Sequence, residues 1–90
     1  MPEVTDNAAE SRFEMTVEGH TALVVYRRQP PNIQLLHAEE PSELEGKGVG
    51  SALVRATLDA VRTEGLKVVP RCPFIAAYIR KNAAYTDMLA

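Results

Sequence analysis

A chain of 90 residues that is 46% hydrophobic and 24% charged has the composition of one globular domain, not of a disordered or fibrous protein. No apolar run approaches the roughly 20 residues needed to cross a bilayer, and the N-terminus lacks the basic-then-apolar pattern of a signal peptide. A formal net charge of −2 excludes the basic excess of a nucleic-acid binder, and Cys72, the one cysteine, cannot form an internal disulfide. We therefore expect a cytoplasmic protein without nucleic-acid or membrane partners.

The charged residues are unevenly divided between the two halves of the chain. Residues 1–45 carry three basic and nine acidic side chains, whereas residues 46–90 carry seven basic and three acidic ones. Because opposite charges attract, an anionic ligand is expected to bind to the second half.

The first half predicts three strands behind a short tail. Residues 1–11 are polar or small and show no period that would bury a face, so they are predicted to be a flexible N-terminal tail preceding a single domain over residues 12–90. Alternating residues 12–17 and the strand-forming residues 20–28 flank a Glu-Gly pair and predict a hairpin. After a Pro-Pro-Asn break, residues 33–38 predict a third short strand.

The second half predicts a helix, a strand and a second helix. Apolar residues recur every three or four positions from Val49, which indicates an amphipathic helix that ends at Gly65. Residues 67–69 form a short apolar run, and Pro73 suits the first position of another helix. The order β-β-β-α-β-α predicts an α+β fold, with a mostly antiparallel sheet of about four strands and helices on its faces. The third strand, the long helix and the fourth strand should form a right-handed βαβ unit.

A glycine-rich loop precedes the long helix, with the sequence E-G-K-G-V-G-S over residues 45–51. Glycine lets the backbone approach a ligand closely, and the unpaired N–H groups at a helix start favour an anion such as pyrophosphate. Lys47 adds a positive charge and Ser51 a hydroxyl. The spacing fits neither a P-loop nor a dinucleotide fingerprint, and a glycine-rich helix cap without any ligand remains an alternative.

The loop E-G-K-G-V-G resembles the [Q/R]-x-x-G-x-[G/A] signature of GNAT acetyltransferases, with Glu45 in place of the leading Gln or Arg. Two longer segments, H-A-E-E-P-S-E-L-E-G-K-G-V-G-S-A-L-V and G-L-K-V-V-P-R-C-P-F-I-A-A-Y-I-R-K-N-A-A-Y, resemble the minimal GNAT-like proteins, and the resemblance runs from about Phe13 to Leu89. It implies a small GNAT-like fold, acetyl-CoA as cosubstrate and no metal. It also implies a pyrophosphate cradle made by Gly46, Lys47, Gly48, Val49, Gly50 and Ser51. Glu45 leaves the backbone cradle intact but brings a carboxylate near the phosphates.

Two residues are candidates for catalysis. Cys72 precedes the second helix, whose N-terminus would lower the pKa of a thiol, although a buried, inert cysteine is the alternative. The resemblance favours an active-site role, because in the family the cysteine lies near the acetyl group. His37 ends the third strand, and an imidazole suits proton transfer at neutral pH, whereas the alternative is a surface histidine. Glu39 and Glu40 rank below His37, because exposed acidic runs are usually only solvated.

The second helix adds candidate contacts to the coenzyme. Lys81 and Asn82 resemble the coenzyme-contacting R-K-[H/N] segment of the family, with a polar helix end as the alternative. Tyr78 is expected to belong to the core. The sequence thus predicts an acetyl-CoA-dependent N-acetyltransferase, and the alternative is a non-catalytic acyl-CoA-binding or interaction module. The acceptor, a small amine or a protein amino group, is left open.

Overall fold

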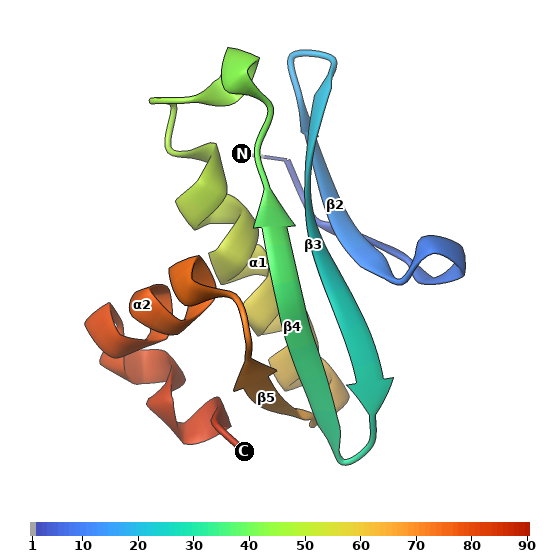
Figure 1. The fold of residues 1–90 in the computed structure, drawn as a ribbon, viewed down its shortest axis with the longest axis vertical. Helices are drawn as coiled ribbons and strands as arrows, with labels where there is room; N and C mark the ends of the chain where they lie inside the picture. Colours follow the sequence, from blue (N-terminus) through green and yellow to red (C-terminus); the bar gives the residue numbers. More distant parts are fainter. Residues whose placement is uncertain (1) are drawn as a thin grey trace.

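Seven regular elements and three short 3₁₀ turns make up the computed structural model, which describes residues 2–90 (Figure 1). The strands are β1 (Thr5–Asn7), β2 (Arg12–Val17), β3 (His20–Gln29), β4 (Asn32–Glu39) and β5 (Lys67–Pro70). The helices are α1 (Val49–Glu64) and α2 (Pro73–Lys81), and the 3₁₀ turns are η1 (Ala8–Glu10), η2 (Ser42–Leu44) and η3 (Ala83–Met88). No helix within residues 2–90 combines the length and the apolar character that spanning a membrane requires.

The strands form one sheet in the order β1-β2-β3-β4-β5. Neighbours pair antiparallel from β1 to β4, whereas β4 and β5 pair parallel and are connected by α1. The predicted α+β fold with a mostly antiparallel sheet and a βαβ unit is therefore confirmed. The order gains one strand over the prediction, since β1 precedes the hairpin.

Strands β4 and β5 stop pairing halfway along β4. Their parallel pairing runs from Asn32 with Lys67 to Leu35 with Pro70, and β4 then continues to Glu39 beside β3 alone. The register between β3 and β4 shifts at this point, because Val25 faces His37 but Tyr26 faces Leu35. Leu36 is the unopposed residue of the bulge that results. The sheet therefore opens beyond Leu35 on the side where the glycine-rich loop and α2 begin.

A single hydrophobic core lies on one face of the sheet. Side chains opposite each other on neighbouring strands share a face, and the buried pairs include Phe13 with Val24 and Tyr26 with Leu35. Both helices add to the same cluster through the residues of their apolar stripes, namely Val49, Leu53, Val54, Leu58, Val61, Ile75 and Ile79. This packing fixes where the first turn of each helix lies relative to the open end of the sheet.

The helix boundaries follow from local chemistry. Gly65 ends α1 in the left-handed conformation, at φ +76°, and its N–H donates to the carbonyl of Arg62 at 3.0 Å. Pro73 occupies the first turn of α2, where its missing N–H costs no hydrogen bond. Both predicted boundaries are confirmed.

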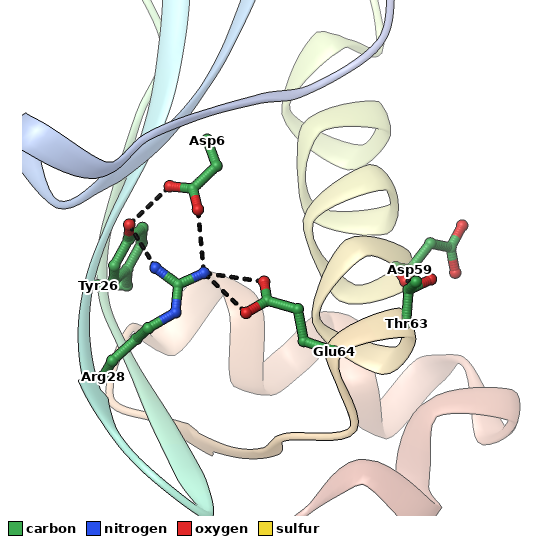
Figure 2. A network of polar contacts seen from close by, with 6 residues as sticks. All are labelled: Asp6, Tyr26, Arg28, Asp59, Thr63 and Glu64. Atoms are coloured by element: carbon green, nitrogen blue, oxygen red, sulfur yellow. Dashed lines mark hydrogen bonds and ion pairs between the residues drawn. The ribbon is translucent and has the colours of Figure 1, made fainter.

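The N-terminal segment differs from the predicted tail. Met1 lies outside the described residues, but Thr5–Asn7 pair with Glu14, Phe13 and Arg12 of β2, and η1 follows. Figure 2 shows one reason, since Arg28 of β3 donates to both Asp6 (3.0 Å) and Glu64 (2.8 Å). The Tyr26 hydroxyl also donates to Asp6 at 2.6 Å. The prediction was wrong for this strand because these contacts join residues that are far apart in the sequence.

Candidate functional site

The glycine-rich loop is a tight turn between η2 and α1. Gly46 and Gly48 both take left-handed backbone conformations, at φ +77° and +74°, which residues with a Cβ rarely adopt. A Cβ added at either position would meet no described atom within 4 Å, so space beside the loop is open. These two glycines are required by the backbone shape and not by crowding.

The first turn of α1 presents unpaired backbone donors. Gly48 is the N-cap, and within residues 2–90 no side chain caps the helix and no acidic residue lies in its first turn. The first α-helical bond runs from the N–H of Ala52 to the carbonyl of Gly48 at 3.1 Å, which leaves the N–H groups of Val49, Gly50 and Ser51 without an intrahelical partner. Together with the helix dipole, these donors favour an anion at this position.

Lys47, the predicted cation of the loop, has a carboxylate partner. Its Nζ donates to Oε2 of Glu18, in the turn between β2 and β3, at 2.5 Å. This hydrogen bond, with the charge of Lys47, holds the pKa of Glu18 below its usual value. This contact could not be predicted from the sequence, because the two residues are far apart along the chain.

A cavity of about 280 Å³ opens beside the loop, where β4 has left β5. Its lining joins the end of β4 to the first turns of both helices through Ala38, Glu39, Glu40, Gly50, Leu53 and Phe74. A Cβ on Gly50 would lie 3.2 Å from Oε2 of Glu40 and 3.4 Å from Cζ of Phe74. Glycine at this position therefore keeps the cavity open between the acidic end of β4 and α2.

Cys72 is the N-cap of α2 and lies where β5 ends. Its N–H donates to the carbonyl of Leu35 at 3.1 Å, which ties it to the last residue of β4 that pairs with β5. The side chain is free of any disulfide, and the residue is 6% exposed and packs in the hydrophobic core. Its position next to the opening of the sheet suits a site residue, while its burial suits a packing residue.

His37 lies on the part of β4 that no longer pairs with β5, and it is exposed. Its Nε2 is 3.2 Å from Oε1 of Glu39, and both side chains are more than half exposed. These residues line a second hollow of about 430 Å³, with Thr21, Glu40 and Pro41. Glu39 and Glu40 line both this hollow and the cavity beside Gly50. Cys72 lies in the core and is not among the residues that line either space.

Lys81 and Asn82 end α2 beside a hollow of about 450 Å³. Asn82 is the C-cap, and its Nδ2 donates to the carbonyl of Tyr78 at 2.8 Å. Tyr78 is half-buried, packs against the core as expected, and also lines the hollow. Arg55 of α1 joins this lining and was missed in the sequence, although it is the first basic residue after the glycine-rich loop.

The described part of the chain contains no cluster of side chains that could bind a metal ion. Among residues 2–90, no three His, Cys, Asp or Glu side chains gather closely enough to hold an ion. The polar groups at the loop are instead backbone N–H donors and a lysine, which suit an anionic ligand.

Comparisons with known proteins agree with this geometry. Residues 12–88 match the family model described as GCN5-related N-acetyl-transferase. Protein NATD1 of Gallus gallus and of Mus musculus are each 36% identical over 50 residues, which is 56% of this chain and 46% of theirs. The match thus spans less than half the length of these relatives.

A solved structure extends the likeness to nearly the whole chain. The solution structure of a GCN5-like protein from Staphylococcus aureus has a TM-score of 0.73 and 27% sequence identity, and the superposition covers 98% of this chain and 87% of that one. With a family model that covers strands β2 to β5, the glycine-rich loop and both helices, the chain belongs to the family of GCN5-related N-acetyltransferases.

Proposed function

We propose that this protein is an acetyl-CoA-dependent N-acetyltransferase that transfers an acetyl group to an amine. The observation that carries the proposal is the place of the glycine-rich loop. It lies at the uncapped start of α1, beside the cavity that forms where β4 leaves β5, in a chain of this family. Acetyl-CoA combines a pyrophosphate with an acyl thioester, so an anion cradle next to a cavity whose lining includes Ala38, Leu53 and Phe74 suits its two ends.

The residues of the loop fit a pyrophosphate through their backbone. The left-handed conformations of Gly46 and Gly48 leave open space beside the chain, and the N–H groups of Val49, Gly50 and Ser51 are available at the helix start. In this proposal Lys47 adds a charge, while Lys81 and Asn82 contact the coenzyme from the end of α2.

Two groups are proposed to move protons. His37 is exposed and paired with Glu39, so its imidazole is placed to accept a proton from an amine that arrives from solvent. Cys72 lies at the start of α2 beside Leu35, and we propose that its thiol donates a proton to the departing thiolate of coenzyme A. The burial of Cys72 favours this role over a covalent carrier, because a carrier must also be reached by the amine.

The burial of Cys72 also supports the second candidate function, a non-catalytic acyl-CoA-binding module. With the thiol in the core at 6% exposure, the protein would keep the cradle and the cavity without turnover. The unpaired state of this cysteine suits a reducing compartment, and we propose a cytoplasmic location.

Two measurements separate these candidates. Calorimetric titration with acetyl-CoA tests the binding that both of them share, and its failure would remove both. Release of free coenzyme A, followed with a thiol reagent in the presence of a panel of primary amines, tests for transfer. If the protein binds acetyl-CoA but amines do not increase the release of coenzyme A, the non-catalytic module is the remaining candidate.

A further inference from the structure

Two hollows beside α1 share the side chains of Arg55 and Tyr78 in their lining. The first, of about 520 Å³, begins at Ser51 in the first turn of α1 and includes both side chains. The second, of about 450 Å³, shares both of them and continues to Lys81 at the end of α2. One trough therefore leads from the glycine-rich loop, over Arg55, to the lysine that ends α2.

The trough carries two positive side chains that form no ion pair among residues 2–90. Arg55 and Lys81 are exposed, and among residues 2–90 no carboxylate lies within ion-pair distance of either. Glu3 and Asp59 also line the first hollow. Asp59, however, already accepts a hydrogen bond from the Tyr85 hydroxyl at 2.8 Å, and this contact adds to burial in raising the pKa of Tyr85.

The helix sets the distance between the loop and Arg55. Ser51 and Arg55 are four residues apart on α1, so they lie on the same side of the helix and about 6 Å apart along its axis. In coenzyme A, the 3′-phosphate is attached to the ribose that carries the pyrophosphate. A pyrophosphate at the first turn of α1 would therefore leave this second phosphate about one helical turn away.

We propose that Arg55 binds the ribose 3′-phosphate of coenzyme A and makes the protein selective for coenzyme A over its 3′-dephospho form. A guanidinium can donate two parallel hydrogen bonds to a phosphate, and Arg55 forms no ion pair with any described carboxylate. Tyr78 lines both hollows, and Lys81 supplies a second positive charge farther along the trough. This inference rests on the proposed function, because it assumes that the pyrophosphate occupies the glycine-rich loop.

The test compares two ligands and three proteins by calorimetry at low salt. The ligands are coenzyme A and 3′-dephospho-coenzyme A, and the proteins are the wild type, Arg55→Gln and Arg27→Gln. Arg27 is an exposed arginine on β3 that is not among the residues lining either hollow, so it controls for the loss of one positive charge. Circular dichroism confirms that each variant is folded.

The wild type is expected to bind coenzyme A about tenfold more tightly than the dephospho form. Arg55→Gln should lose this preference by weakening the binding of coenzyme A alone, whereas Arg27→Gln should keep it. Equal binding of the two ligands by the wild type, or an unchanged preference in Arg55→Gln, would overturn the role of Arg55 and leave the proposed function intact. Failure of the wild type to bind either ligand would overturn both proposals.

Discussion

The ammonium of Lys47 donates a hydrogen bond to the carboxylate of Glu18 at 2.5 Å and so joins the glycine-rich loop to the turn between β2 and β3. Both side chains are about half exposed, so water and salt screen the attraction. The lysine that would face a bound phosphate is thus shared with a carboxylate of the same chain. Glu18 and a coenzyme phosphate are expected to compete for it.

Removing Glu18 should therefore strengthen acetyl-CoA binding. We expect Glu18→Gln to raise the affinity by up to about fivefold at low salt and Lys47→Gln to lower it by a similar factor, in line with about 1 kcal/mol for an exposed ion pair. Calorimetry at two salt concentrations measures both effects, which should shrink at high salt. Glu10→Gln is the control, since it changes the net charge equally at an exposed residue of η1. Weaker binding by Glu18→Gln would show that the pair positions the loop instead of competing with the ligand.

Gly48 and Gly65 form a matched pair for testing the loop. They flank α1 with nearly the same backbone conformation, at φ +74° and +76°, and a Cβ on either would meet no described atom within 4 Å. Substitution by alanine should destabilise the fold by about 1 kcal/mol in each case, because both positions are left-handed. Acetyl-CoA affinity should fall about tenfold only in Gly48→Ala, whose methyl group enters the space proposed for the phosphates. If calorimetry gives the same acetyl-CoA affinity for Gly48→Ala and Gly65→Ala, the phosphates do not bind at this loop.

Arg28 is expected to be a major polar contributor to stability. Figure 2 shows its guanidinium between Asp6 and Glu64, which connects β1, β3 and the end of α1. Burial lowers the pKa of Arg28, but its hydrogen bonds to Glu64 and Asp6 outweigh that effect and raise it. Arg28→Met should reduce the free energy of unfolding by about 2 kcal/mol, measured by urea titration. The neighbouring Arg27→Met, at an exposed position, should change it by less than about 0.5 kcal/mol. Similar losses in both variants would exclude a specific role for the contacts of Arg28.

Glu14 should make part of the stability depend on pH. Its carboxylate accepts hydrogen bonds from Arg12 at 2.5 Å and Asn7 at 3.1 Å, and these bonds hold its pKa below the usual 4.5. A pKa that is lower in the folded state stabilises the fold above pH 4.5, and this contribution is lost as the pH falls through the folded value. Urea titrations between pH 7 and pH 3 should show wild type more stable than Glu14→Gln at pH 7 and the difference shrinking in acid. A difference that does not change with pH would contradict this role.

The sequence predicted those parts of the fold that depend on local chemistry. The boundaries of α1 and α2 followed from the period of Val49, Leu53 and Val61 and from the effects of Gly65 and Pro73 on the backbone. Strand β1 was missed because it has only three residues, all of them exposed or half-buried. The hydrogen bond that holds it, from Arg28 to Asp6, comes from another strand. No local pattern reports a contact of that kind.

In the candidate site, too, the local features were predictable from the sequence and the contacts between distant residues were not. The open backbone at Gly46 and Gly48 was predictable, because left-handed glycines at a helix start have a local signature. The partner of Lys47 and the groups around Arg55 were not, since both depend on how the hairpin, α1 and α2 pack together. The bulge at Leu36 also has no sequence signal here, although it marks where β4 departs from β5.

Cys72 offers the most direct test of the proposed chemistry. If its thiol donates a proton to departing coenzyme A, Cys72→Ala should lower the rate of amine-dependent coenzyme A release at least tenfold and leave acetyl-CoA affinity unchanged within about twofold. The affinity should survive because the glycine-rich loop belongs to α1, whereas Cys72 caps α2. Some loss of stability, about 1 kcal/mol, is expected from the smaller side chain in the core. Kinetics are therefore compared at a temperature where both proteins are fully folded.

Mass spectrometry of the wild type after incubation with acetyl-CoA decides between an acid and a covalent carrier. With a residue that is only 6% exposed, we expect no acetyl increment on the peptide containing Cys72. An increment that appears and then disappears when an amine is added would assign the carrier role instead. Full activity in Cys72→Ala would make the thiol a packing residue, and proton transfer would then depend on His37, whose imidazole lies 3.2 Å from Glu39. In that case His37→Gln should lower the rate of amine-dependent coenzyme A release at least tenfold and leave acetyl-CoA affinity unchanged within about twofold.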